Sequence, residues 1–368
     1  MNIILRNRIS SLIFLFSALC WSCNETEETD WKISPQPRQA SKSIINAFGT
    51  YQVAGLAEIH YNVETWKLIQ QIIKDNQEAQ AFRVFAFEGG NSLYQATMDD
   101  YVNGGDVSVQ ELKKVWRNNT LINTTYDAPV YLEFINSIRQ ANEKLAPGKK
   151  FRIILLDPPI DWATVTSDIQ FKSFQAQRVN SMIEIIEKEV YAKNEKVLFI
   201  AGSNHTSRSL PTAPVPSALS SLEERHPGTT LSIGVYNGFG VDDNELSEIE
   251  ANFQGWPLNS IVLLEGSAVG EIPAATNTRM KGSGGTLVDP FNGAPLKSVH
   301  DALVFVGNRN SLTVSDPATA ICGSAADDIA WRNEIIRRQE LVKRLPFLRY
   351  TFESLCTPLP AAYFDHIR

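Results

Sequence analysis

Four separate hydrophobic runs in this chain each end at a residue that can carry acid, base or metal chemistry. Each run has the length of a buried strand, and most are followed by a segment of helical length and period, which is the order of a parallel α/β sheet. Because the carboxyl ends of parallel strands meet at one edge of a sheet, we expect the residues that follow the runs to share one crevice. The runs are 51–57, 82–87, 151–156 and 196–201.

The whole pattern predicts an α/β fold with a mainly parallel central sheet flanked by helices, as a single domain over 41–368. Three expected helices fall between the second and third runs, which predicts a helical subdomain at about 91–146 over the carboxyl edge of the sheet. A stretch rich in Gly, Pro, Thr and Asn, at about 266–298, is interpreted as a lid, a binding loop or a disordered excursion. Helices are expected at 62–76, 91–101, 108–117, 128–145 and 168–192, and further strands at 230–236, 261–264 and 302–306.

The N-terminal segment has the features of an export signal. Arg6 and Arg8 precede an apolar stretch at 12–19 that is too short to span a bilayer but suits the core of a signal peptide. The stretch leads to Cys23, which follows the small residue Ser22, and acidic and polar residues come next. This arrangement resembles a bacterial lipoprotein signal, and an ordinary cleaved signal is the alternative.

The resemblance implies a signal peptide at 1–22, lipid on Cys23 and an acidic, polar tether at 23–40. We therefore expect a cell-envelope protein anchored by lipid to the outer membrane, on its periplasmic or its surface face. No second segment has transmembrane length, so the membrane would be reached through the lipid alone. The formal net charge is −7 and there is no basic tract, which argues against nucleic acid as a partner.

Two cysteines, Cys322 and Cys356, remain in the folded part once Cys20 leaves with the signal and Cys23 carries lipid. Outside the cytoplasm such a pair often forms a disulfide, and two buried free thiols are the alternative. The folded part has no CxxC pair, so a cysteine zinc site is not expected.

The first run leads into Glu58 and His60. In extended geometry the two side chains point to the same face, so one carboxylate and one imidazole can act on a common atom. A carboxylate beside a histidine holds its tautomer and raises its basicity, and both groups can bind metal. The alternative is that Glu58 caps the next helix and His60 is a core histidine.

The other runs end in similar chemistry. Glu88 follows an apolar strand and must meet a donor, a cation or water, unless it caps the next helix. Asp157 is held extended by the proline after it, either as a site carboxylate or as a structural acceptor. Gly202 lets the chain turn so that His205 faces the sheet edge, and Arg208 is positioned to hold an anionic group; a surface-loop histidine is the alternative.

These elements, Glu58-Ile59-His60, Phe87-Glu88 and Gly202-x-x-His205, resemble the superfamily of erythromycin esterases, ChaN-type haem-binding lipoproteins and Tiki/TraB proteases. The resemblance implies catalytic roles for Glu58, His60, Glu88 and His205. Ala57 stands where the family usually has glycine, and the Glu-x-His spacing is one residue shorter than in the esterases. An esterase-like branch is indicated by segments around 94–101, 116–117 and 157–162, and substrate-binding roles are expected for Tyr61, Asn91, Tyr94, Arg117, Asp157 and Arg208.

The leading hypothesis is a hydrolase of an ester or amide bond in a small-molecule or peptide substrate, with water activated by His60 or Glu58. The same four side chains, Glu58, His60, Glu88 and His205, could alternatively hold a divalent metal. The rival class is a haem- or iron-binding lipoprotein for uptake, with a histidine or Tyr61 as the axial ligand. A non-catalytic binding module is a third class.

Overall fold

The sheet at the centre of the protein is ordered β1-β7-β10-β6-β2-β5-β3-β4. A computed structural model describes residues 35–208, 216–238, 241, 243–276, 280–281, 287–289, 291–344 and 349–360. From β10 to β4 all neighbouring strands are parallel, and β7 runs antiparallel to both β10 and β1. The predicted α/β class is confirmed. The strands are β1 Arg38–Gln39, β2 Val53–Ala57, β3 Val84–Asn91, β4 Arg152–Asp157, β5 Val197–Ala201, β6 Thr230–Val235, β7 Ser260–Leu263 and β10 Ala302–Phe305.

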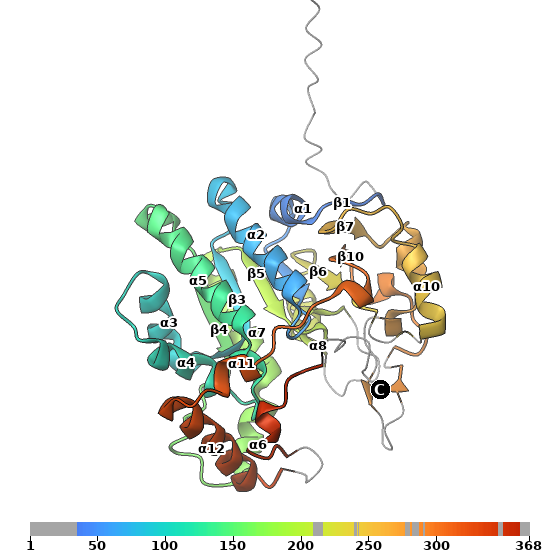
Figure 1. Cartoon of the computed structure of the whole chain (residues 1–368). Coiled ribbons are helices and arrows are strands. Elements are labelled where there is room, and N and C mark those ends of the chain that lie inside the picture. The colour runs from blue at the N-terminus through green and yellow to red at the C-terminus, as the bar shows by residue number, and fades with distance from the viewer. Residues whose placement is uncertain are drawn as a thin grey trace, which may run out of the picture. The chain divides into compact units, whose positions relative to one another are not determined.

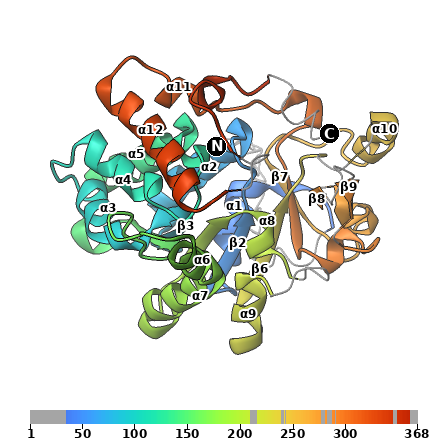
Figure 2. The ribbon, with the colours of Figure 1, turned by 90° about the horizontal axis from the view of Figure 1, so that it is seen from below.

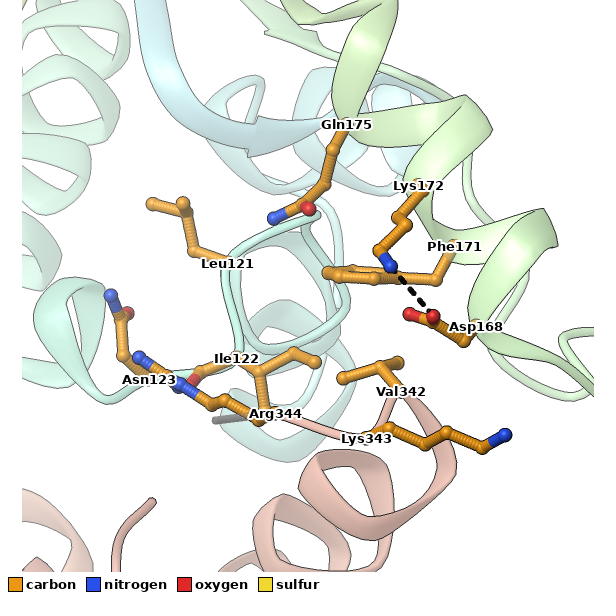
Figure 3. A pocket seen from close by; sticks show the side chains of 10 residues that line it. All are labelled: Leu121, Ile122, Asn123, Asp168, Phe171, Lys172, Gln175, Val342, Lys343 and Arg344. Atoms are coloured by element: carbon orange, nitrogen blue, oxygen red, sulfur yellow. Dashed lines mark hydrogen bonds and ion pairs between the residues drawn. The ribbon is translucent and has the colours of Figure 1, made fainter. Parts of the chain in front are cut away.

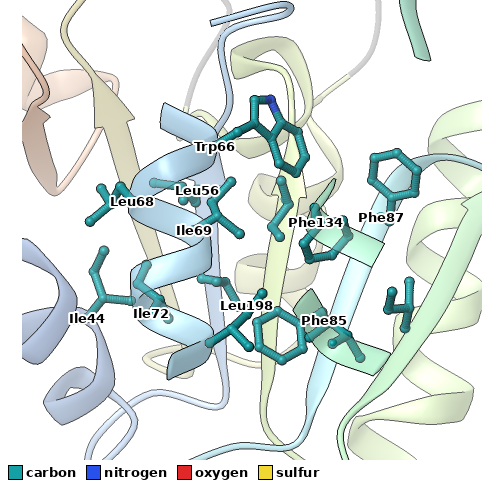
Figure 4. Close-up of a cluster of buried hydrophobic side chains, with 14 of the residues drawn as sticks. Ile44, Leu56, Trp66, Leu68, Ile69, Ile72, Phe85, Phe87, Phe134 and Leu198 are labelled. Atoms are coloured by element: carbon teal, nitrogen blue, oxygen red, sulfur yellow. The ribbon is translucent and has the colours of Figure 1, made fainter. Parts of the chain in front are cut away.

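Helices cover both faces of this sheet (Figure 1). One face packs against α1, α2 and α5, and Figure 4 shows Trp66, Ile69 and Ile72 of α2 beside Leu198 and Phe85 of the strands. The opposite face packs against α7 and α9. The helices are α1 Ala40–Ala47, α2 Val63–Ala79, α3 Gln95–Val102, α4 Val109–Arg117, α5 Pro129–Lys144, α6 Asp168–Ala176, α7 Arg178–Glu189, α8 Ser203–Thr206, α9 Ala218–Arg225, α10 Asp243–Ala251, α11 Ala318–Ile321 and α12 Ala326–Leu341.

The strands β2 and β5 lie side by side, but the chain leaves them in opposite directions. After β2 it crosses through α2 on one face to β3, and after β5 it crosses through α8 and α9 on the other face to β6. Open α/β sheets generally bind ligands at such a reversal, outside the carboxyl ends of the two strands.

The residues expected to form a helical subdomain, 91–146, do not all lie over the carboxyl edge of the sheet. Helix α5 packs on α2, whereas α4 and the following loop, 118–127, lie toward the ends of β3 and β4. The C-terminal α12 holds this loop, because Trp331 Nε1 donates to Asp127 Oδ2 at 2.9 Å and Arg338 Nη1 donates to the carbonyl of Arg117 at 2.7 Å. Figures 1 and 2 show α6 and α12 on the same side of the sheet as α8.

Cys322 and Cys356 form a disulfide with an S–S distance of 2.07 Å. The bond ties the chain after α12 back to the end of α11. A fourth hydrophobic cluster lies beside it and joins α6, α12 and the loop at 118–127, so the disulfide closes the lobe that covers the carboxyl edge. Its largest members are Trp162, Phe171 and Trp331.

The described parts of the segment 266–298 pack against β7 and β10, through Val269, Ile272 and Leu296. They belong to a cluster at the far end of the sheet from β3 and β4. Among the described residues, no helix has the length and apolar character needed to cross a membrane. The predicted signal at 1–22, Cys23 and the tether as far as residue 34 lie outside the described residues, and the end of that tether, Arg38–Gln39, forms β1.

Candidate functional site

Glu58 and His60 follow β2 directly and form a close pair. The backbone amide of Glu58 donates to the carbonyl of Ala201 at 2.9 Å, which extends the ladder between β2 and β5 past the end of the strand. This contact fixes the position of the carboxylate, whose side chain is 2% exposed. Nδ1 of His60 then contacts Oε1 of Glu58, while the imidazole itself is 40% exposed. The pair therefore presents its histidine to solvent and keeps its carboxylate inside.

Glu88 lies at an irregularity in β3, where the register with β4 shifts between Phe87 and Asn91. Its Oε2 accepts a hydrogen bond of 2.8 Å from the backbone amide of Gly202, at the end of β5. Its Oε1 accepts from Arg178 Nη2 at 2.8 Å and lies 3.3 Å from Nε2 of His205. Glu88 thus collects an amide, a guanidinium and an imidazole, which explains how a carboxylate can be buried at the end of an apolar strand.

The two groups of residues meet at Gly202. A methyl group on this glycine would lie 3.7 Å from Oε2 of Glu88 and 3.9 Å from Cε1 of His60. The structure therefore brings Glu58, His60, Glu88 and His205 into one crevice, although the first and the last are far apart in the sequence. The crevice lies where the chain reverses direction between β2 and β5.

Asp157 lies behind Glu88 at the end of β4 and is completely buried. Both of its oxygens accept hydrogen bonds from Thr120, one from the amide at 2.6 Å and one from the hydroxyl at 2.7 Å. Arg178, the first residue of α7, reaches Oδ1 of Asp157 at 3.4 Å and so joins it to Glu88. One buried cation therefore lies between two buried carboxylates, a position that sequence reasoning did not assign to Arg178.

The electrostatics separate the roles of these groups. Partial loss of hydration would by itself lower the pKa of His60, but the charge of Glu58, the hydrogen bond to it and the charge of Glu88 together raise that pKa to about 9. Burial alone would raise the pKa of Glu88, but His205, Arg178 and His60 hold it well below its usual range. Burial raises the pKa of Asp157 to about 6, against the opposing charge of Arg178. At neutral pH the crevice therefore holds a protonated His60 between carboxylates.

Tyr126 is a site residue that the sequence analysis missed. It belongs to the short 3-10 turn Thr125–Asp127, and its ring centroid lies 5.9 Å from that of His60 in an edge-on arrangement. The ring also occupies the space where a side chain at position 89 would be, since a methyl on Gly89 would approach Cδ1 of Tyr126 to 2.5 Å. Burial, Glu88 and Glu58 raise the pKa of Tyr126 well above its usual value, so its hydroxyl stays protonated.

Three buried polar atoms of the crevice residues have no hydrogen-bond partner in the structure: Oε2 of Glu58, the hydroxyl of Tyr126 and Nδ1 of His205. Buried polar groups are nearly always paired, because an unpaired one costs about 1–3 kcal/mol. An open acceptor on Glu58 and an open hydroxyl on Tyr126 therefore indicate a place where water or a ligand group completes the hydrogen bonding.

Other expected substrate-binding residues have structural partners. Asn91 donates to the carbonyls of Asn118 and Ile160 and caps the following turn. The hydroxyl of Tyr94 accepts from Asn118 at 2.9 Å. Both side chains hold the loop at 118–127 in place.

Arg117 and Arg208, both expected to bind substrate, are each paired with a carboxylate other than Glu58 and Glu88. Arg117 donates from Nε to Oδ1 of Asp127 at 2.8 Å and stacks over the ring of Trp331. Arg208 donates to both oxygens of Asp301 and to the carbonyl of Thr230. Each guanidinium is thus paired with a carboxylate of the protein, and the substrate-binding roles of Arg117 and Arg208 stay predictions.

Tyr61 connects the crevice to the 3-10 turn. Its backbone is left-handed, with φ 68°, and its hydroxyl is 2.9 Å from Oγ1 of Thr125. The turn at Tyr61 separates His60 from the start of α2 by a single residue. Asn62 then caps α2, because its side chain accepts from the amide of Thr65 at 2.7 Å.

Protein partners already engage several of the side chains that a metal centre or haem would use. Within the residues that the structure describes, no group of three or more His, Cys, Asp or Glu side chains is arranged to hold a metal ion. Both oxygens of Glu88 are already engaged by protein donors. Nδ1 of His60 contacts Glu58 and the Tyr61 hydroxyl is bonded to Thr125, whereas Nδ1 of His205 has no partner.

No protein-family model and no curated protein matches this chain. A solved structure of a Bacillus cereus protein is similar, with a TM-score of 0.50 and 14% identity over 76% of this chain and 96% of that one. An erythromycin esterase in its open conformation scores 0.49, at 12% identity over 73% of this chain and 94% of that one. ChaN of Campylobacter jejuni with bound haem scores 0.36, at 15% identity over 53% and 85%. At such identities likeness extends to the fold alone, so the chemistry of this crevice has to be judged from its own geometry.

Proposed function

We propose that the crevice hydrolyses an ester or amide bond, with Glu58 as the base that activates water. The observation that carries the proposal is the open, buried Oε2 of Glu58 next to a protonated His60 and the unpaired hydroxyl of Tyr126. A hydrolase of this type needs an acceptor for the proton of water and donors for the charge that develops on the carbonyl oxygen. The crevice supplies both within one small space.

The proposed reaction begins when Oε2 of Glu58 takes a proton from water. The water oxygen bonds to the carbonyl carbon, and the hydroxyl of Tyr126 and the imidazolium of His60 stabilise the resulting oxyanion. The tetrahedral intermediate then collapses, the bond to the leaving oxygen or nitrogen breaks, and Nε2 of His60 gives its proton to that atom. When the products have left, Oε2 of Glu58 releases its proton to solvent and Nε2 of His60 takes a proton from solvent, so the site returns to its starting state.

Glu88, His205 and Arg178 act as positioning residues in this scheme. The negative charge of Glu88 raises the pKa of His60, which keeps the acid protonated at neutral pH. Arg178 and the amide of Gly202 hold the carboxylate of Glu88 by hydrogen bonds, so this side chain keeps its orientation. His205 closes the same side of the crevice.

We propose in addition that this hydrolase works in the cell envelope, anchored to the outer membrane by lipid on Cys23. The support is the signal-like sequence at 1–22 and the acidic residues after Cys23. The disulfide between Cys322 and Cys356 agrees with an oxidising compartment.

A panel of 4-nitrophenyl esters and 4-nitroanilides, incubated with the purified mature protein, tests the reaction. Hydrolysis by the wild type should fall by about 10²–10⁴-fold in Glu58→Gln and in His60→Ala. His226→Ala is the matched control, because His226 pairs with Glu187 and stacks on Tyr191 away from the crevice. Equal rates in all three variants would show that any hydrolysis has another origin.

Titration with haemin is the second measurement. A histidine-ligated haem would give a Soret band whose intensity follows His60. We expect no such band, because the imidazole of His60 is protonated at neutral pH.

A further inference from the structure

A cavity of about 460 Å³ is lined in part by the loop at 118–127, the loop that also carries Tyr126. It is bounded by α6, by the loop at 118–127 and by the residues that follow α12 (Figure 3). Ligand pockets usually measure about 300–1,000 Å³, so this cavity has room for a substantial part of a small molecule. Its lining residues are Leu121, Ile122, Asn123, Asp168, Phe171, Lys172, Gln175, Val342, Lys343 and Arg344.

The lining combines an apolar wall with an excess of positive charge. Its walls are aliphatic and aromatic, and it carries Lys172, Lys343 and Arg344 against the one carboxylate of Asp168. That carboxylate is already held by Lys172 at 2.7 Å. The chain as a whole has a net charge of −7, so the charge around this cavity is opposite in sign to that of the protein.

Arg344 is the cation best placed to meet a ligand. Nη1 donates to the carbonyl of Ile122, and Figure 3 shows the guanidinium beside Asn123 at one end of the cavity. Within the described part of the chain, no carboxylate forms an ion pair with Arg344 or Lys343. A guanidinium without a carboxylate, beside an apolar wall, suits an anion that is attached to an apolar group.

The cavity and the crevice are built on the same loop. Gln175 lines the cavity and donates to the carbonyl of Thr120 at 3.5 Å, and Thr120 holds Asp157. The loop continues from Asn123 in the cavity wall to Tyr126 in the crevice. Their Cα atoms can be at most about 11 Å apart, because three residues span no more than about 3.6 Å each. A substrate of modest size could therefore occupy both places at once.

We propose that this cavity binds the non-reacting end of the substrate, an apolar acyl or aryl group that ends in an anion such as a carboxylate or sulfonate. The word substrate rests on the proposed hydrolase function, whereas binding of an apolar anion by the cavity does not. The apolar body packs against the wall formed by Leu121, Phe171 and Val342, and the anion lies at Arg344.

Two fluorescent probes that differ by one charged group test the proposal on the mature protein. The anionic probe is 8-anilinonaphthalene-1-sulfonate, and N-phenyl-1-naphthylamine is the same body without the sulfonate. Arg344→Gln should weaken the anionic probe by about three- to tenfold and change binding of the neutral probe by less than about twofold. Arg344→Lys should recover part of the loss, because it keeps the charge.

Further variants separate the cavity from other apolar surfaces. Leu121→Trp fills the cavity and should weaken binding of both probes. If Arg344→Gln fails to fold, Lys343→Gln tests instead whether positive charge favours binding of the anionic probe. Lys188→Gln is the matched control, since this exposed lysine lines a different cavity with Tyr191 and His226. The proposal is overturned if the wild type binds the two probes equally, or if Leu121→Trp and the charge variants all bind the anionic probe as the wild type does.

Failure of the cavity proposal and failure of the hydrolase proposal give different results. Selective anion binding without hydrolysis of any nitrophenyl ester or nitroanilide would keep the cavity and reject the hydrolase. Hydrolysis that depends on His60, with no preference for esters carrying a terminal carboxylate, would keep the hydrolase and reject the cavity as the substrate subsite.

Discussion

The backbone amide of Gly202 donates a hydrogen bond of 2.8 Å to Oε2 of Glu88 and so joins the carboxyl ends of β5 and β3. This bond uses the one oxygen of Glu88 that does not face Arg178. Because position 202 is a glycine, no side chain of its own lies between Glu88 and His60 there. The open space, rather than either side chain alone, is where the proposed reaction would occur.

Gly202→Ala should reduce hydrolysis by at least about tenfold while leaving the fold intact. The new methyl would lie in ordinary contact with Glu88 and with His60, at 3.7 and 3.9 Å, and the backbone at Gly202 is extended and allowed for alanine. The free energy of unfolding should therefore change by no more than about 0.5–1 kcal/mol, as measured in urea. Gly148→Ala, where nothing lies within 4 Å, is the control and should keep full activity. Full activity in Gly202→Ala would place the reaction elsewhere.

Tyr126→Phe should lower kcat by about 10²–10³-fold, the usual loss when one oxyanion donor is removed. Stability should stay the same or rise slightly, because the hydroxyl is buried without a partner in the free protein. Tyr236→Phe, which removes a hydroxyl bonded to Glu250, serves as the control for loss of a buried phenol. A loss of stability in Tyr126→Phe with unchanged kcat would instead indicate a structural hydroxyl.

The pH profile of kcat/KM for a nitroanilide tests the assignment of His60 as the acid. The pKa of His60 is raised to about 9, and the proposed reaction needs the protonated form. Activity should therefore be steady near neutral pH and fall as the pH rises through about 9. Because Glu88 raises this pKa, the falling limb in Glu88→Gln should move to lower pH. Activity that increases with pH over the same range would make His60 the base.

Arg178→Met should destabilise the protein by about 3–5 kcal/mol at neutral pH, since it leaves Glu88 and Asp157 buried without their cation. Urea unfolding measures the effect. The control is Arg337→Met, which breaks a half-exposed pair with Glu334 and should cost less than about 1 kcal/mol. If the two variants were equally stable, Arg178 would not be the cation that holds the crevice together.

Cys23→Ala should leave the protein without acyl chains and should release it from the membrane fraction or leave it unprocessed. The reason is that the sequence offers no other site for the proposed anchor after the signal. Metabolic labelling with a fatty-acid analogue measures the change. Cys20→Ala is the matched control and should still be labelled, and lipid recovered on Cys23→Ala would disprove the anchor.

The elements of the sheet that position the crevice were predictable because their signals are local. A buried parallel strand reads as a continuous apolar run, and the residue after it must lie at the carboxyl edge. This is why the sequence alone could predict that Glu58, Glu88 and His205 lie in one place. The short edge strand β1, with two residues, gives no such signal and was expected to be tether.

The residues that complete the crevice were not predictable in the same way. Arg178 lies in the stretch 168–192, which was expected to be one helix. The structure instead has two helices, interrupted at Gln177, and α7 begins at Arg178. On an amphipathic helix a lone arginine reads as part of the solvated face, and its two carboxylate partners are brought to it only by tertiary folding. Tyr126 lies in a turn without period. The signal that could have suggested it is Gly89, a glycine beside a site carboxylate, because it indicates that a bulky neighbour comes close.

The bond from α12 to the loop at 118–127 has a consequence for folding, because α12 comes late in the chain. The last strand of the sheet, β10, is synthesised before Trp331 and Arg338, of which Trp331 bonds to Asp127 beside Tyr126 and Arg338 bonds to the end of α4. The strands of the sheet can therefore pair during synthesis before the C-terminal segment is available to position the loop at 118–127. If the proposed hydrolase function holds, a chain cut ahead of α12 would lose the bond from Trp331 to Asp127 and with it the support of the neighbouring Tyr126.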